Sequence, residues 1–331
     1  MTQDKKISIN IKSSTINKVS DEYPIEAPYP NNILIEVTNA CNLKCSICYH
    51  PKMKRKIGYM SDDMYEKIID EVAEMGIENL GLYTTGEAFL HPKIFDFIKQ
   101  AKDKGIPYVY ITTNGLLINK KKIEQVFASG LDSVKISIDA GSKEKYEEMK
   151  IGGNWDVLVD NIKALKQLRD EKNSKLRIFA SYVVVQDDFD DLKKYKEMFD
   201  CLVDETIYTL VSNQAHMDNI ESVYKSKLES KFNYLVLPQE KWHPCGYLWN
   251  RFMTTYDGKL TICCNDFEAR LIYGDLNQSS LKECWNNEKM KSFRKIHKEK
   301  KFQELPLCDI CDFVMKDFDT EMKILKQIED L

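Results

Sequence analysis

Three cysteines stand close together near the start of the chain, in the segment CNLKCSIC. Cys41, Cys45 and Cys48 have the spacing C-x3-C-x2-C and directly follow a predicted strand. Thiolates are ligands of zinc and of iron–sulfur clusters, and a structural zinc site takes four ligands. No fourth cysteine lies nearby in the sequence, which favours a 4Fe–4S cluster with one iron open to an added ligand. A zinc site completed by His50 is the alternative.

Alternating strands and helices from about residue 31 would position these cysteines. We predict strands at 33–38, 80–83, 108–113, 133–138, 176–185 and 206–211, with helices between them. This alternation implies a parallel sheet, and six units are too few to close an eight-stranded barrel. We expect an α/β fold, a partial (β/α)6 TIM-like barrel, with its chemistry at the carboxyl ends of the strands.

A different pattern begins after residue 240. A hairpin over 253–263 turns at Asp257-Gly258, and a helix is predicted near 280–297. Together they predict a small α+β domain followed by a C-terminal helix. That helix has an apolar stripe that predicts docking onto the protein, or a dimer contact as the alternative; its members are Phe318, Met322, Leu325, Ile328 and Leu331. The predicted segments are an N-terminal extension 1–30, the barrel 31–215, a linker 216–240, the small domain 241–315 and the C-terminal helix 316–331.

Composition limits the partners and the location of the chain. With 331 residues, 43% hydrophobic and 30% charged, the chain is long enough for one large and one small globular domain. A net charge of −4 without a clustered basic surface argues against nucleic-acid and membrane partners. We found no signal peptide and no run of about 18 apolar residues, so we expect a cytoplasmic protein. Ten cysteines in that reducing compartment indicate metal binding or catalysis.

The first cysteine motif is similar to that of the radical S-adenosylmethionine (SAM) superfamily. Three later segments, each at the end of a predicted strand, also resemble motifs of that family. They are Thr85-Gly86-Glu87-Ala88 for its GGEP motif, Thr112-Thr113-Asn114-Gly115 for TTNG, and Ser137-Ile138-Asp139 for S-[IL]-D. The first glycine and the proline of GGEP are replaced, and Ile47 stands where the family often has an aromatic residue. Four motifs in order at successive strand ends make coincidence remote.

The resemblance implies a SAM molecule bound to the open iron of the first cluster. Thr85 and Gly86 would belong to the SAM site, and Glu87 would accept a hydrogen bond from the SAM ammonium group. Asn114 would lie near the methionyl or ribose groups. For the last motif, the resemblance implies that Ser137 contacts the SAM carboxylate and Asp139 the ribose hydroxyls.

The C-terminal cysteines resemble the SPASM/twitch extension of radical SAM enzymes. Cys245, Gly258 and Cys263 fit its C-x12-G-x4-C pattern, and Cys308 and Cys311 follow as C-x2-C. By this resemblance the four thiolates hold one auxiliary 4Fe–4S cluster, because a full SPASM domain needs seven cysteines and none follows Cys311. A zinc ribbon made by the same four cysteines is the alternative.

Three cysteines remain outside both sets. Cys264 neighbours Cys263, and adjacent residues of a strand point to opposite faces, so we expect Cys264 to face away and pack. Cys201 and Cys284 lie in predicted helices and are expected to be small buried apolar side chains. Hydrogen-atom donation to a substrate is the less favoured role for all three.

The resemblance also implies the reaction. A reductant of the flavodoxin or ferredoxin type would reduce the first cluster, SAM would be cleaved to a 5′-deoxyadenosyl radical, and this radical would abstract a substrate hydrogen. The chemistry belongs to oxygen-sensitive cofactors, and the protein would position the substrate and exclude water.

Twitch enzymes include aminocyclitol dehydrogenases and epimerases, so we expect a dehydrogenase or epimerase acting on a small polar, carbohydrate-like substrate such as a sugar or aminocyclitol. A peptide-modifying maturase is the alternative; peptide modifiers often carry a leader-binding domain of about 80–90 residues, whereas only about 30 residues precede the first strand here. A non-catalytic electron carrier is disfavoured because it would not need a SAM site. For an alcohol oxidation, the candidate bases are His216, Arg251 and Asp266.

Overall fold

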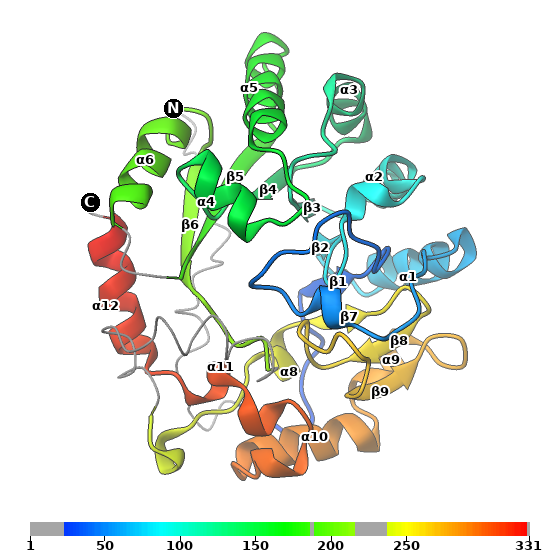
Figure 1. Ribbon diagram of the computed structural model, residues 1–331. Helices are drawn as coiled ribbons and strands as arrows, with labels where there is room; N and C mark the ends of the chain where they lie inside the picture. The colour runs from blue at the N-terminus through cyan, green and yellow to red at the C-terminus, as the bar shows by residue number, and fades with distance from the viewer. Residues whose placement is uncertain (1–22, 186–188, 216–236, 330–331) are drawn as a thin grey trace, which may run out of the picture.

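The computed structural model describes residues 23–185, 189–215 and 237–329 (Figure 1). These residues form a mixed α/β fold around one nine-stranded sheet with the strand order β6-β5-β4-β3-β2-β1-β7-β8-β9. The strands are β1 Asn32–Ile35, β2 Asn79–Gly81, β3 Tyr108–Thr113, β4 Ser133–Ser137, β5 Arg177–Val184, β6 Glu205–Leu210, β7 Phe252–Thr254, β8 Lys259–Thr261 and β9 Ile272–Asp275.

Helices connect these strands. The α-helices are α1 Asp62–Glu74, α2 Ile94–Asp103, α3 Lys120–Ser129, α4 Lys143–Met149, α5 Trp155–Glu171, α6 Phe189–Phe199, α8 Tyr247–Asn250, α9 Leu281–Trp285, α10 Glu288–Lys298, α11 Asp312–Met315 and α12 Phe318–Glu329. Short 3-10 helices are η2 His50–Lys52, η3 Ala88–Leu90, η6 Gln239–Lys241, η7 Phe302–Glu304 and η8 Cys308–Ile310.

The six strands β1 to β6 pair in parallel and in the order of the sequence. The sheet is curved, and helices α1 to α6 lie along its outer side (Figure 1). This arrangement confirms the predicted partial TIM-like barrel. The carboxyl ends of the parallel strands meet at one rim, so the loops that follow them share one end of the barrel.

Alternation along the strands separates an outer face from an inner face. In β3, Val109 and Ile111 are fully buried and belong to the apolar core beneath the helices, whereas Tyr110 and Thr112 point to the other side. On the helix side, the ring of Phe97 from α2 stacks on Tyr65 from α1 at 3.9 Å. The outer face is therefore a packed apolar layer, and the inner face carries the polar side chains of the barrel.

Side-chain caps define the start of several helices. The side chain of Ser61 accepts a hydrogen bond from the amide of Met64 at the start of α1. The side chains of Asn119 and Asn154 each accept one from the amide three residues further on, at the starts of α3 and α5. Gly130 ends α3 with a φ of 79°, which a glycine adopts without steric cost. Local sequence signals thus set the helix ends that lead into the strands.

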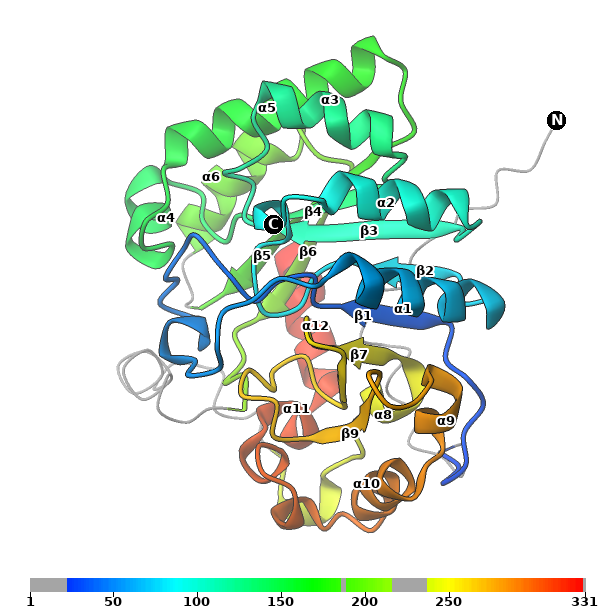
Figure 2. The ribbon, with the colours of Figure 1, turned by 90° about the vertical axis from the view of Figure 1, so that its right-hand side faces the viewer.

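The C-terminal part of the chain continues the barrel sheet. Strand β7 pairs in parallel with β1, and the antiparallel hairpin β7–β8 turns at Gly258, whose φ is 81°. The hairpin was predicted, but its pairing with β1 was not. The helix predicted near 280–297 is two helices, α9 and α10, because Asn287 caps the second by accepting a hydrogen bond from the amide of Met290 at 2.8 Å. Figure 2 shows β7 beside β1, with β9, α9 and α10 on the side of β7 that faces away from β1.

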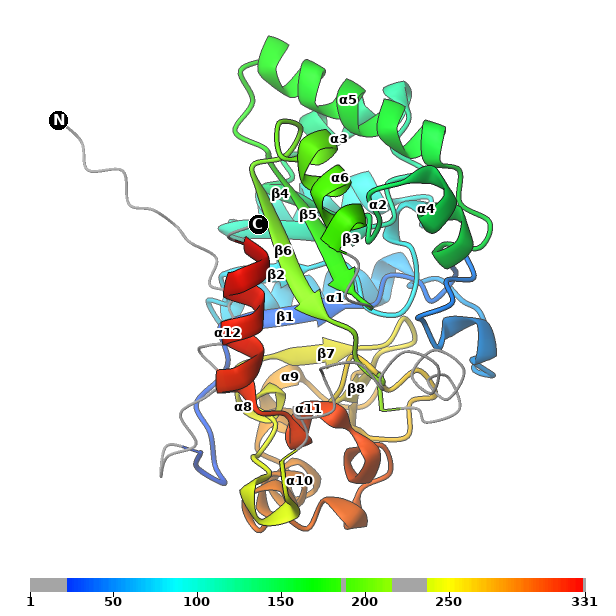
Figure 3. The same ribbon diagram turned by 60° about the vertical axis from the view of Figure 1, so that its left-hand side comes forward.

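Helix α12 packs beside β6 at the other end of the sheet (Figure 3). Phe318, Leu325 and Ile328 are buried, and Lys196 of α6 donates hydrogen bonds to the carbonyl groups of Ile328 and Glu329. The predicted docking helix is confirmed; Leu331 lies outside the described residues. None of the helices among the described residues is both long and apolar enough to span a bilayer.

Candidate active site

The first cysteine motif forms the loop that follows β1 at the rim of the barrel. Cys41, Cys45 and Cys48 interact electrostatically with one another, so their thiols share one location. Burial is the main cause that raises the pKa of Cys41 to about 12 and that of Cys48 to about 11. Isolated thiolates are therefore costly here, and coordination to a metal centre would supply the missing stabilisation.

Gly86, in the motif that follows β2, lies against the backbone that leads into the cysteine loop, and only glycine fits there. A Cβ on Gly86 would lie 2.5 Å from the carbonyl oxygens of Thr38 and Ala40, because the backbone leading to Cys41 crosses directly over it. The amide of Glu87 also donates a hydrogen bond to the oxygen of Ala40 at 2.7 Å. The end of β2 thus fixes the point at which the cysteine loop begins.

The third and fourth strand ends hold the rest of this loop. The side chain of Asn114 donates a hydrogen bond to the side chain of Asn42 at 2.8 Å. In α4, the helix that follows β4, the carbonyl of Met149 accepts a hydrogen bond from the amide of Ser46 at 2.8 Å. The sequence motifs at successive strand ends are therefore brought together around the three cysteines.

The carboxylate of Glu87 is buried and ties two strand ends together. Its oxygens accept hydrogen bonds from the Thr113 hydroxyl and the Asn114 amide, each at 2.8 Å, and from the Phe89 amide at 3.2 Å. Burial raises the pKa of Glu87, and these donors oppose that shift. In this structure the side chain supports the rim, and its contact with SAM stays a prediction.

Asp139 forms a buried ion pair with Lys150. The two side chains are 2% and 5% exposed, and the second carboxylate oxygen of Asp139 accepts the amide of Val183 at 2.9 Å. Lys150 also lies close enough to Cys45 to favour its thiolate. No sequence pattern singles out Lys150, because a lysine in the helical stretch KYEEMK is typical of a solvated face. The ribose contact of Asp139 stays a prediction, as does that of the half-buried Ser137 with the SAM carboxylate.

The segment after the first cysteines contacts the C-terminal part directly. The carboxylate of Glu268 accepts hydrogen bonds from the amides of Lys54 and Arg55 at 2.8 and 3.1 Å. The guanidinium of Arg55 pairs with the buried Glu36 of the barrel at 2.5 Å. Glu268 follows Cys263 by five residues, so the loops carrying the two cysteine sets are fastened to each other.

The four C-terminal cysteines of the predicted auxiliary site also converge. Electrostatic contacts link Cys245 with Cys263, Cys308 and Cys311, although Cys308 follows Cys245 by 63 residues in the sequence. Burial raises the pKa of Cys245 to about 12 and also raises that of Cys308 and Cys311, whereas the pKa of Cys263 is raised first by its hydrogen bond with Cys264 and then by burial. The amide of Asn265 donates a hydrogen bond to the sulfur of Cys263 at 3.3 Å.

The structure corrects two expectations about the remaining cysteines. Strand β8 ends at Thr261, so the alternation rule does not reach Cys264, and its thiol hydrogen-bonds that of Cys263 instead of facing away. Cys201 was expected to be buried and is exposed, because it follows the end of α6. Cys284 is buried as expected, and a Cβ on Gly274 would lie 2.5 Å from its sulfur.

The three candidate bases differ in their surroundings. Asp266 is buried, and its oxygens accept hydrogen bonds from the Thr261 hydroxyl and from the amides of Arg270 and Leu271 at 2.7–2.9 Å. Arg251 immediately precedes β7 and interacts electrostatically with Tyr83 and Tyr110. His216 lies outside the described residues. The base assignment stays a prediction for all three.

No three histidine, cysteine, aspartate or glutamate side chains of residues 23–185, 189–215 and 237–329 converge tightly enough to hold a single metal ion. Nε2 of His50 donates a hydrogen bond to the carbonyl oxygen of Asn39, 2.7 Å away. Both cysteine sets offer sulfur ligands alone, three in one place and four in the other, which suits iron–sulfur clusters.

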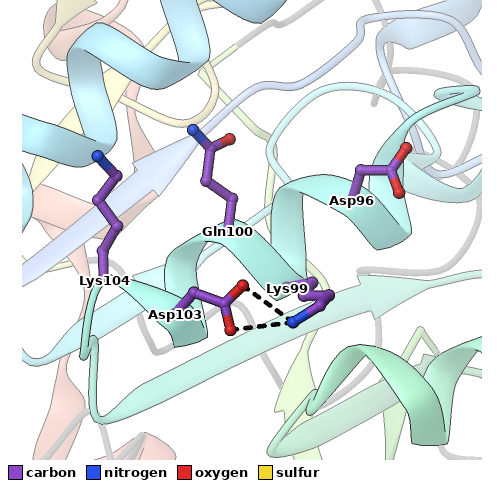
Figure 4. A pocket seen from close by; sticks show the side chains of 5 residues that line it. All are labelled: Asp96, Lys99, Gln100, Asp103 and Lys104. Atoms are coloured by element: carbon purple, nitrogen blue, oxygen red, sulfur yellow. Dashed lines mark hydrogen bonds and ion pairs between the residues drawn. The ribbon is translucent and has the colours of Figure 1, made fainter.

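A surface hollow of about 550 Å³ lies on the outside of α2 (Figure 4). It is lined by Asp96, Lys99, Gln100, Asp103 and Lys104. Lys99 and Asp103 pair with each other across one helical turn, and Lys104 pairs with Asp70. The hollow contains none of the predicted site residues.

Family models match both halves of this arrangement. The model of the radical SAM superfamily matches residues 35–195, and that of the iron–sulfur cluster-binding SPASM domain matches residues 245–312. This chain is a radical SAM enzyme with a SPASM-type domain. Its cofactors are therefore SAM, the SAM-binding 4Fe–4S cluster and auxiliary iron–sulfur clusters. The two sets of cysteines described above fit these clusters.

Curated relatives of this radical SAM enzyme differ in their sequence identity to it and in the share of their length that it covers. It is 24% identical to the tungsten-containing aldehyde ferredoxin oxidoreductase cofactor-modifying protein of Pyrococcus furiosus, over 85% of this chain and 89% of that protein. It is 32% identical to the GTP 3′,8-cyclase of Limosilactobacillus fermentum over 47% of each chain, so it spans about half the length of that enzyme.

Solved structures share the fold of this radical SAM enzyme. The complex of BtrN with AdoMet and 2-DOIA has a TM-score of 0.58 and 18% identity, covering 86% of this chain and 94% of BtrN. Streptococcus suis SuiB bound to S-adenosylmethionine has a TM-score of 0.62 and 16% identity, covering 86% of this chain and 72% of SuiB. At these identities the likeness concerns the fold.

Proposed function

We propose that this radical SAM enzyme oxidises or epimerises a small polar substrate, such as a sugar or aminocyclitol, with the help of one auxiliary 4Fe–4S cluster. The observation that carries the proposal is the convergence of four cysteines at a site that borders the barrel interior through Cys264. The thiol of Cys264 contacts Cys263 and interacts with Lys135 on the inner face of β4. One auxiliary cluster would thus sit beside the space in which a substrate meets SAM.

Each cofactor has a set of residues that would hold it. Cys41, Cys45 and Cys48 would bind the first cluster, and Cys245, Cys263, Cys308 and Cys311 the auxiliary one. Thr85, Gly86, Glu87, Asn114, Ser137 and Asp139 would form the SAM site. When bound and reduced, the first cluster and SAM supply a radical that removes a hydrogen atom from the substrate.

In this proposal the protein positions the first cluster and keeps water away from the reacting atoms. The motif side chains at the strand ends fix the cysteine loop, as the hydrogen bonds of Glu87 and Asn114 illustrate. The apolar layer under the helices keeps the rim rigid, and the barrel wall would exclude water from the reacting atoms. Electrons would come from a flavodoxin or ferredoxin type of partner.

Support for a small substrate comes from the fold of BtrN, which is covered almost completely and was solved with 2-DOIA. A peptide substrate is the second candidate, because the fold of SuiB, which was also solved with its precursor peptide SuiA, fits with a TM-score of 0.62. Fold likeness alone does not choose between them.

Deuterium transfer into 5′-deoxyadenosine tests the proposal. The reconstituted enzyme would be incubated under reducing conditions with perdeuterated sugars and aminocyclitols in one arm and perdeuterated peptides in the other. We expect deuterated 5′-deoxyadenosine from the first arm, with either a carbonyl product or an inverted carbon that has gained solvent hydrogen. Transfer from the peptide arm alone would contradict the small-substrate proposal.

Metal content tests the proposed ligand sets. We expect about eight irons and eight sulfides per chain after anaerobic reconstitution, because two 4Fe–4S cubes hold that number. Cys311→Ala should lower both to about four, because it removes one of four ligands from the auxiliary site. Cys201→Ala is the matched control and should leave the content unchanged. About four irons with one zinc would rule out the auxiliary cluster.

A further inference from the structure

Two cationic side chains share the inner side of the barrel. Lys135 lies in β4 between Val134 and Ile136, which are buried beneath the helices, so Lys135 points to the opposite, inner face. Arg251 precedes β7, the strand that pairs with β1. The two groups interact electrostatically across the interior, and each also interacts with the thiol of Cys264.

Aromatic rings, and not carboxylates, surround these two cations. The ammonium nitrogen of Lys135 lies 5.9 Å from the ring centre of Tyr83, and the guanidinium of Arg251 lies 4.3 Å from that of Tyr247. Arg251 also donates a hydrogen bond from Nε to the side chain of Asn250 at 3.0 Å. Among the residues that the structure describes, neither cation forms an ion pair with a carboxylate.

The carboxylate that interacts with Lys135 is that of Asp139, which already forms an ion pair with another residue. Asp139 interacts with Lys135 at longer range but forms its ion pair with Lys150. Burial lowers the pKa of Lys135, and the charge of Arg251 adds to that shift. Two like charges in a shared, poorly solvated interior repel each other, so this arrangement gains stability when an anion binds between them.

The position of the pair matches the expected place of a substrate. Lys135 precedes Ser137 by two residues on the same face of β4, which separates them by about 6.6 Å. On the other side, Cys264 adjoins Cys263 of the proposed auxiliary site. The two cations therefore lie between the proposed SAM site and the proposed auxiliary cluster.

We propose that Lys135 and Arg251 bind an anionic group of the substrate, a carboxylate or a phosphate. Arginine offers a planar fork that fits the oxygens of either group, and lysine adds a compact charge. The charged ends of Lys135 and Arg251 lie over the rings of Tyr83 and Tyr247, which do not neutralise them, so their N–H groups can still bind an anion. The inference rests on the proposed function and narrows it to acidic small molecules.

Binding of three matched sugars to the reconstituted enzyme with SAM tests this inference. Glucose 6-phosphate, glucuronate and glucose share a ring and differ in carrying a phosphate, a carboxylate or no charge, and their affinities would be measured by anaerobic calorimetry. We expect at least one acidic sugar to bind about tenfold or more tightly than glucose, since a charged hydrogen bond contributes about that factor. The stronger of the two acidic sugars identifies the preferred group.

Substitutions connect this binding to the two side chains. Lys135→Gln and Arg251→Gln should each lower the affinity for the acidic sugar about tenfold, whereas Lys135→Arg should retain most of it. Lys99→Gln, on the surface of α2, is the control and should bind as the unmodified enzyme does. Should a variant fail to fold, the comparison of the three sugars on the unmodified enzyme still decides the inference.

Two results would overturn the inference. One is equal binding of glucose and both acidic sugars to the unmodified enzyme. The other is a changed reduction potential of the auxiliary cluster in Lys135→Gln and Arg251→Gln without any change in sugar affinity, which would mean that the cations serve the cluster. Failure of the proposed function would look different, because deuterium would then reach 5′-deoxyadenosine from the peptide arm alone, whichever sugar the enzyme binds.

Discussion

Asp139→Asn should lower the free energy of unfolding by about 3–5 kcal/mol, the usual loss when one partner of a buried ion pair is removed. Lys150 would keep its charge while only 5% exposed, with no counter-charge beside it. Asparagine preserves the size of the side chain and tolerates the left-handed backbone at this position, where φ is 63°. Urea unfolding followed by circular dichroism measures the loss.

A double-mutant cycle separates the ion pair from other effects of this substitution. Lys150→Met should also destabilise the protein, whereas the double variant Asp139→Asn, Lys150→Met should recover part of the loss, because no buried charge remains unpaired. Lys99→Met, which breaks an exposed helical pair with Asp103, is the control and should cost about 0.5 kcal/mol or less. Additive losses in the cycle would contradict a buried ion pair.

Trp285→Ala should cost about 3–5 kcal/mol, the range for removal of a large buried aromatic side chain. Trp285 of α9 is fully buried, and its ring lies 4.7 Å from that of Phe252 in β7. Its indole N–H donates hydrogen bonds to the carbonyls of Ala27 and Pro28, and Arg294 stacks over its ring at 4.4 Å. The substitution therefore removes the side chain that joins α9 to the shared sheet.

Trp249→Ala is the matched control for this prediction. Trp249 is half-buried, and its indole donates one hydrogen bond, to the carbonyl of Pro24 at 2.7 Å. Its removal should cost clearly less than that of Trp285, and Trp285→Phe should recover part of the loss because it restores an aromatic ring. Equal losses for the two tryptophans, measured by urea unfolding, would contradict the packing described here.

Periodicity in the sequence predicted the barrel well because each strand and helix carries its own local signal. The strand at 108–113 alternates in burial from end to end, and it is β3 within the same bounds. The short strands of the C-terminal part were harder, since β7 has three residues and its parallel pairing with β1 is a long-range contact. No local pattern records such a pairing, so the continuation of the barrel sheet into β7, β8 and β9 could not be predicted.

Residue types predicted the site where chemistry restricts the choice. The cysteine spacings led to two groups that the structure does bring together. Lysine is common on protein surfaces, so residue type alone did not indicate that Lys150 and Lys135 lie inside the barrel. Cys264 was assumed to lie in a strand, but β8 ends three residues before it, at Thr261. Its thiol therefore points toward Cys263 and not away from it.

SAM cleavage by the anaerobically reduced, reconstituted protein tests the central claim most directly. Chromatography with mass detection would measure 5′-deoxyadenosine formed by the unmodified protein, by Cys45→Ala, and by Cys201→Ala as the control for cysteine loss at an exposed position. We predict 5′-deoxyadenosine from the unmodified protein and from Cys201→Ala, and none above background from Cys45→Ala. Cleavage by Cys45→Ala at the rate of the unmodified protein, or no cleavage by a fully iron-loaded protein, would contradict the proposed site.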